Sequence, residues 1–209
     1  VQTGEGRPAP NRRDGSAADE LPREALRELV GGEAGLLRRL RETMPEQFAH
    51  TGRIAEVSAR AAAHIGADEL FCEAVAWYRE IGKLEDQSDF SASGERLMHE
   101  ADMPEELISS VRMAGMKNAA AKNRETAIVV LTANVITELE AAKPGKAKDG
   151  KAKSGKTDIS RNRMVDNIFL VRLIKGTLDE SGLTVRDYSR LRQFFLTEFG
   201  LQEKQKKGE

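Results

Sequence analysis

Histidine side chains are the first candidates for metal binding or proton transfer in this sequence. The chain has three of them, His50, His64 and His99. No two have the short spacing that places a pair of metal ligands on one helix face. We expect His64 and His99 to be exposed to solvent, and His50 to lie on or beside the inward face of a helix.

A cysteine and a lysine offer two other kinds of chemistry. Cys72 has no nearby partner for nucleophilic catalysis, and its apolar surroundings favour a small buried side chain. As the single cysteine it cannot form an intramolecular disulfide, which fits a reducing cytosol. Lys83 follows Gly82 without the glycine-rich sequence of a phosphate loop. We expect a lysine in solvent at a helix end, with a phosphate contact as the alternative.

The composition favours one all-helical domain. The chain has 209 residues, of which 39% are hydrophobic and 5% aromatic, and no long stretch alternates polar and apolar residues. This predicts a single bundle of about eight helices over residues 20–201. The net charge of −1 gives no reason to expect a specific nucleic-acid partner. No apolar run could cross a bilayer and no signal peptide is recognisable, so we expect a soluble protein.

Three segments outside this core are polar. Residues 143–158 are a low-complexity tract rich in lysine and glycine, which predicts a flexible surface insertion because it has little apolar surface to bury. Contact of this tract with anionic lipid or nucleic acid is the alternative to a solvated loop. Residues 1–19 are interpreted as a flexible linker or end, and residues 202–209 as a polar tail.

Apolar spacing, caps and glycines predict the positions of the helices. We expect them at about 21–29, 33–44, 46–66, 68–82, 93–101, 104–116, 126–142, 160–180 and 184–199. Asp68 and Thr184 are the predicted N-caps, and Gly82 is expected to end its helix in a left-handed conformation. The apolar run 127–131 could form a strand, but the spacing continues through Leu139 and favours a helix. The inward positions of the 160–180 helix are expected to include Met164, Ile168, Val171 and Ile174.

Several short motifs occur in an order that resembles one known family. Leu-Leu-Arg-Arg-Leu at 36–40 precedes Pro45, Phe-Ala-His-Thr at 48–51 and Tyr-Arg-Glu-Ile-Gly-Lys at 78–83. Residues 125–131 and 179–184 continue the similarity, which covers roughly residues 26–201. Together they resemble the cytoplasmic HD domain of the seven-transmembrane HD receptors, a branch of the HD metal-dependent phosphohydrolases. Active members hydrolyse cyclic di-AMP. The resemblance implies an HD-type helical bundle attached to an upstream membrane-spanning or sensor portion.

The resemblance also implies a centre of two iron or manganese ions held by histidine and aspartate, and this chain has lost most of those ligands. His50 matches the first histidine. Arg79 and Glu80 stand where the family has its His-Asp pair, although arginine has no lone pair to donate and glutamate is one methylene longer than aspartate. The other ligand positions match residues that cannot bind a metal in this way: Phe90, Ala114, Gly115 and Ala133.

The charge of Arg79 acts against a metal. A guanidinium about 4 Å from a dication is repelled by roughly 8 kcal/mol even at an effective dielectric constant of 20. With most donors also lost, we expect no bound metal, no cofactor and no catalytic residue. Arg79 is expected to neutralise Glu80 or to occupy the place of the metals.

Three functions remain open. The first is a catalytically inactive HD domain that acts as a regulatory, scaffolding or dimerisation module, with a second copy or a partner domain. The second is a sensor that binds a cyclic dinucleotide or another nucleotide without cutting it, with Arg79, Lys83 or Lys117 on the phosphates. The third is a residual phosphodiesterase with a rebuilt site around His50 and Glu80. The resemblance implies a cytoplasmic location for all three.

Overall fold

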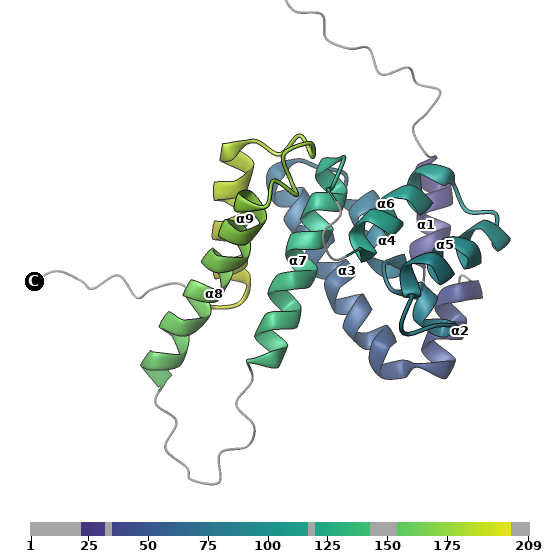
Figure 1. Cartoon of the computed structure of the whole chain (residues 1–209), viewed down its shortest axis with the longest axis horizontal. Helices are drawn as coiled ribbons and strands as arrows, with labels where there is room; N and C mark the ends of the chain where they lie inside the picture. Colours follow the sequence, from purple (N-terminus) through teal and green to yellow (C-terminus); the bar gives the residue numbers. More distant parts are fainter. Residues whose placement is uncertain (1–21, 32–34, 117–119, 143–153, 202–209) are drawn as a thin grey trace, which may run out of the picture.

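The computed structural model describes residues 22–31, 35–116, 120–142 and 154–201, and their side chains except those of 154–161. These residues form nine α-helices and one 3₁₀-helix, with no strand among them (Figure 1). The predicted all-α bundle is confirmed. No helix in this part of the chain is long and apolar enough to cross a bilayer. The expectations for residues 1–19, 202–209 and Lys117 lie outside the described residues.

The first four helices begin close to the predicted positions. They are α1 (Arg23–Val30), α2 (Gly35–Thr43), α3 (Pro45–Ile65) and α4 (Glu69–Tyr78). Gly66 ends α3 with a φ of 74°, and the Asp68 carboxylate accepts hydrogen bonds from the Leu70 and Phe71 backbone N–H groups. Residues 66–68 thus form a tight connection that lays α4 back along α3.

The end of α4 differs from the prediction. The helix stops at Tyr78, and after Arg79 and Glu80 the chain forms the 3₁₀-helix η1 (Ile81–Leu84). Gly82 is not one of the glycines with positive φ, so the predicted left-handed cap was wrong. A Cβ at Gly82 would instead lie 1.9 Å from the carbonyl oxygen of Phe90. The glycine is needed because η1 packs directly on the backbone of α5 (Phe90–Glu100).

α7 (Arg124–Ala141) lies in the middle of the molecule in Figure 1. It packs against α3, α4, α8 and α6 (Glu105–Gly115). Most of its side chains are buried, including all of residues 127–131. A helix with partners on several sides can be apolar around most of its surface, which explains the five consecutive apolar residues and confirms helix rather than strand.

α8 (Ser154–Ile174) and α9 (Val185–Glu198) pack against each other on the far side of α7 from α5 and α6 (Figure 1). The Thr184 side chain accepts a hydrogen bond from the Asp187 N–H, and the Asp187 carboxylate accepts one from the Thr184 N–H. This reciprocal capping box confirms Thr184 as the N-cap of α9.

The prediction for α8 needs three corrections. The helix begins at Ser154, inside the tract expected to be a flexible insertion, and residues 143–153 lie outside the described residues. It ends at Ile174 because Gly176 adopts a φ of 62°. Ile174 and Val171, predicted to face inward, are 75% and 47% exposed, whereas Phe169 is buried. Helix growth is cooperative, so polar residues at 154–158 can extend a helix whose later turns are packed.

Candidate functional site

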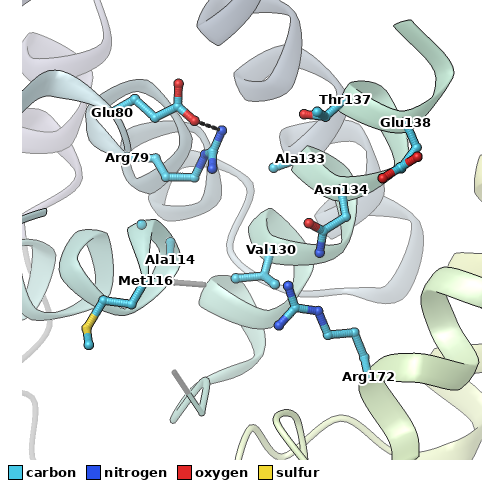
Figure 2. A pocket seen from close by; sticks show the side chains of 11 residues that line it. Arg79, Glu80, Ala114, Met116, Val130, Ala133, Asn134, Thr137, Glu138 and Arg172 are labelled. Atoms are coloured by element: carbon cyan, nitrogen blue, oxygen red, sulfur yellow. Dashed lines mark hydrogen bonds and ion pairs between the residues drawn. The ribbon is translucent and has the colours of Figure 1, made fainter. Parts of the chain in front are cut away.

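A cavity of about 270 Å³ lies where α6, α7, α8 and the segment after α4 meet (Figure 2). Most positions matched to the family's metal ligands line it, although they are far apart in the sequence. These are Arg79, Glu80, Ala114, Gly115 and Ala133. The rest of the wall consists of Met116, Val130, Asn134, Thr137, Glu138 and Arg172.

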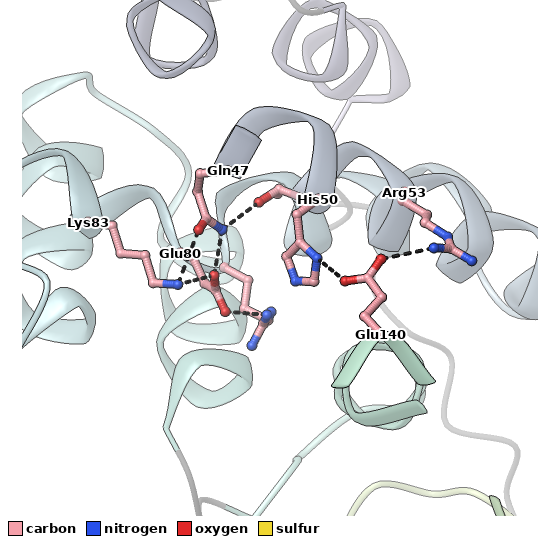
Figure 3. A network of polar contacts seen from close by, with 8 residues as sticks. Gln47, His50, Arg53, Glu80, Lys83 and Glu140 are labelled. Atoms are coloured by element: carbon pink, nitrogen blue, oxygen red, sulfur yellow. Dashed lines mark hydrogen bonds and ion pairs between the residues drawn. The ribbon is translucent and has the colours of Figure 1, made fainter. Parts of the chain in front are cut away.

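The two remaining matched positions lie beside this cavity. A Cβ on Gly115 would be 3.4 Å from the ring of Phe90, so that ring packs against the cavity wall. Figure 3 shows the His50 ring between Glu80 and Glu140. The structure therefore brings all the matched positions into one region, while the role of that region stays a prediction.

Arg79 and Glu80 form a buried ion pair. The Arg79 Nη2 donates to Glu80 Oε1, and the side chains are only 13% and 10% exposed. Burial lowers the pKa of Arg79, and the Glu80 charge raises it; an arginine stays charged at neutral pH. The expectation that Arg79 neutralises Glu80 is confirmed, because the guanidinium faces the carboxylate rather than solvent.

Two more donors reach the other oxygen of Glu80. Lys83 Nζ lies 2.5 Å and Gln47 Nε2 2.7 Å from Glu80 Oε2 (Figure 3). Burial alone raises the pKa of Glu80, but the charge of Arg79 and the hydrogen bond and charge of Lys83 outweigh it, so the pKa is lowered. Glu80 is therefore ionised at neutral pH, with both of its oxygens already engaged by protein donors.

The expectation that Lys83 lies in solvent was wrong. Its side chain is 24% exposed, it is paired with Glu80, and its Nζ lies 5.4 Å from the centre of the Phe90 ring. It also does not line the cavity. The sequence suggested a position at a helix end, but η1 turns the chain so that the Lys83 ammonium group pairs with the Glu80 carboxylate.

His50 is half-buried on α3, as predicted. Its Nδ1 lies 2.9 Å from Glu140 Oε2, and Arg53 donates to the other oxygen of Glu140, also at 2.9 Å. This links α3 to the C-terminal end of α7. Glu140 was missed in the sequence, where it is one of two glutamates near the end of the helix and has no distinguishing spacing.

Arg172 is a cationic residue of the cavity wall that the sequence did not reveal as part of the site. It reaches from α8 toward the cavity near Val130 and Asn134 (Figure 2). Its guanidinium has no hydrogen bond or ion pair with any residue that the structure describes, and burial lowers its pKa. The available signal was a charged residue within the apolar run Leu170–Ile174.

The donors in this region do not fit the pair of metal ions. Within the described ranges no three His, Cys, Asp or Glu side chains are placed to hold a metal. The carboxylates of the cavity wall are Glu80, held by two cations, and Glu138, which is exposed. Hard and borderline cations need several oxygen or imidazole donors that converge. This wall has two guanidinium groups, Arg79 and Arg172, and only isolated oxygen donors.

The other reactive side chains lie elsewhere. His64 and His99 are exposed, as predicted. Cys72 is fully buried, also as predicted, and burial raises the pKa of its thiol well above the usual value. A protonated, inaccessible thiol is not a nucleophile.

Solved structures identify the fold. The chain is similar to the crystal structure of the HD domain of the phosphodiesterase PgpH from L. monocytogenes, with a TM-score of 0.65, 14% identity and coverage of 79% of this chain and 97% of that one. It is also similar to the complex of that domain with cyclic di-AMP, with a TM-score of 0.67, 14% identity and coverage of 79% and 96%. No protein-family model and no curated protein matches the sequence. The chain therefore has the fold of an HD domain, as the motif order predicted.

Proposed function

We propose that this chain is a non-catalytic HD domain that acts as a regulatory, scaffolding or dimerisation module. The observation that supports this most is the buried Arg79–Glu80 ion pair. A fixed guanidinium repels a dication, and a carboxylate already bound by Arg79, Lys83 and Gln47 has little capacity left to bind one. Without a metal, the domain cannot activate water for phosphodiester hydrolysis by the metal-dependent route.

The resemblance to receptor domains supports a place for this module within a larger protein. On this proposal it lies in the cytoplasm, beside a membrane-spanning or sensor portion, and acts through a second copy or a partner domain. No iron or manganese cofactor is part of the proposal.

Elemental analysis tests the proposal. The protein is purified without added metal, then incubated with manganese and iron, and its metal content is measured together with cleavage of cyclic di-AMP. We expect less than about a tenth of an equivalent of metal and no turnover above a protein-free blank. One bound equivalent, or cleavage that is lost in both His50→Ala and Glu80→Ala, would establish a residual phosphodiesterase instead.

A second candidate is a sensor that binds a nucleotide without cutting it. Two guanidinium groups, Arg79 and Arg172, line the same cavity, which favours this candidate, and one of the similar HD domains was solved with cyclic di-AMP. Cyclic di-AMP should then raise the melting temperature, because a ligand that binds only the folded state stabilises it. An unchanged melting temperature with about 1 mM cyclic di-AMP, and likewise with adenosine monophosphate, would remove this candidate.

A further inference from the structure

We propose that the cavity between α7 and α8 is a binding site for the phosphate group of a small molecule, and that Arg172 is its main contact. This deepens the sensor candidate and rests on the proposal that the site holds no metal. It assigns a ligand class to a residue that lies outside the positions matched to the family's metal site.

The first argument is the state of Arg172. Arg172 is partly buried beside the cavity, its guanidinium has no ion pair with a carboxylate of the described residues, and burial lowers its pKa. Taking a cation out of water is costly unless an anion or a set of acceptors takes the place of the water. A ligand carrying negative charge would supply that partner.

The second argument is the opposite wall. Arg79 is held in position by its ion pair with Glu80, and a guanidinium has five N–H donors, of which the described contacts use one. Glu80 is in turn balanced by Lys83, so Arg79 and Lys83 together outweigh its charge by one unit. The second guanidinium is therefore oriented before any ligand arrives, which lowers the entropy cost of binding.

The third argument is the remaining wall and the size of the cavity. Asn134 and Thr137 offer neutral donors, while Val130 and Met116 offer apolar surface. Planar guanidinium groups with neighbouring donors match the geometry of phosphate oxygens. A volume of about 270 Å³ is near the lower limit for small-molecule sites, which favours a phosphate monoester over a larger ligand.

Glu138 is the one wall carboxylate without a described cation partner. Its side chain is exposed, so solvent screens its charge more strongly than that of a buried group. It lies next to Thr137 on α7 (Figure 2), and both side chains are exposed, whereas Arg79 and Arg172 are partly buried. Solvent therefore weakens the negative charge of Glu138 more than the positive charges of the two guanidinium groups.

Calorimetric titration at constant ionic strength tests the proposal. Inorganic phosphate and adenosine monophosphate are titrated into the wild-type protein, into Arg172→Gln, and into Arg163→Gln as the matched control. Arg163 is an exposed arginine of the same helix that does not line the cavity. We expect binding to weaken about tenfold or more in Arg172→Gln, as for the loss of a hydrogen bond to a charged group. Arg163→Gln should bind like the wild type.

Three results would overturn the inference. In the first, neither probe binds the wild-type protein at about 10 mM. In the second, Arg172→Gln binds the probes as tightly as the wild type. In the third, Arg163→Gln loses as much affinity as Arg172→Gln. If the titrations give one of these results and the protein holds no metal, the phosphate site is excluded but the proposed non-catalytic function is not contradicted. Bound metal in the elemental analysis would instead contradict the proposed function itself, so the two failures are distinguishable.

Discussion

Glu80 is enclosed by cations on both of its oxygens. Arg79 binds one oxygen, and Lys83 and Gln47 bind the other, in a part of the molecule where the carboxylate is 10% exposed. Ions buried in this way are stable only while the partners stay together, because a lone buried charge loses its hydration without compensation. The stability of this region therefore depends on each partner being present.

The neutral substitution Glu80→Gln should be strongly destabilising. It leaves the buried Arg79 charge unpaired, and removal of one partner of a buried pair typically costs about 3–5 kcal/mol. Urea unfolding monitored by circular dichroism measures the loss. Glu85→Gln is the matched control, since Glu85 pairs with Arg96 at the surface and should cost less than about 1 kcal/mol.

The difference between wild type and Glu80→Gln should depend on pH. Because the pKa of Glu80 is lowered in the folded state, its stabilising effect is complete above the unfolded pKa of about 4.3 and disappears as the pH falls through the folded value. A difference that is as large at pH 3 as at pH 7 would contradict the role of the ionised carboxylate.

Sequence patterns predicted part of this site. His50, Arg79 and Glu80 were recognised because their spacing follows a known motif, and the structure gathers them with Ala114, Gly115 and Ala133. Arg172 and Glu140 were not found, since their places depend on how α7 and α8 pack. Lys83 was misplaced for a related reason: the 3₁₀ turn that redirects it depends on contact with α5.

At the scale of secondary-structure elements, the junction of η1 with α5 is closely packed, backbone against backbone. A Cβ on Gly82 would meet backbone atoms of two residues, Phe90 and Gly94, at 1.9 and 2.4 Å. Backbone cannot move aside as a flexible side chain can, so η1 and α5 would have to separate. Their separation would also shift Lys83 and Phe90 beside the cavity.

Gly82→Ala should therefore destabilise the fold by about 3 kcal/mol or more, at the upper end of the range for overpacking. Thermal unfolding measures the effect. Gly35→Ala is the control, because nothing lies within 4 Å of its Cβ position and its φ is not positive. It should be neutral, or stabilise α2 by up to about 1 kcal/mol. Equal melting temperatures for the two variants would show that the close approach at Gly82 does not limit stability.

Element boundaries were predictable where local chemistry determines them. Asp68, Thr184 and Gly66 mark helix ends through hydrogen bonds and backbone conformation that depend on near neighbours. The ends and the inward face of α8 could not be predicted in this way, because its apolar residues occur on more than one face. Packing against α7 and α9 selects Val165 and Phe169 and leaves Val171 and Ile174 exposed.

At the scale of the whole molecule, burial is uneven. α7 is covered on several sides, whereas the C-terminal turns of α8 expose Leu170, Val171, Leu173 and Ile174. Regions with few buried apolar contacts open at lower free energy than the global unfolding transition.

Hydrogen exchange should reflect this difference. Backbone amides of α7 are expected to exchange at least about tenfold more slowly than those of residues 170–174 in α8. Mass spectrometry of peptides from the two helices measures the ratio in one experiment. Equal protection would indicate that α8 is stabilised by a contact absent from the isolated chain.

The Arg79–Glu80 ion pair also has a consequence for evolution. A change of Arg79 to histidine would provide one imidazole donor and leave Glu80 without its strongest partner, while Ala114, Gly115 and Ala133 in the same wall would still offer none. Each such intermediate would lose folding stability before it gained a metal. Stepwise acquisition of a metal site is therefore selected against, and descendants of this chain are expected to keep the pair or to replace both members together.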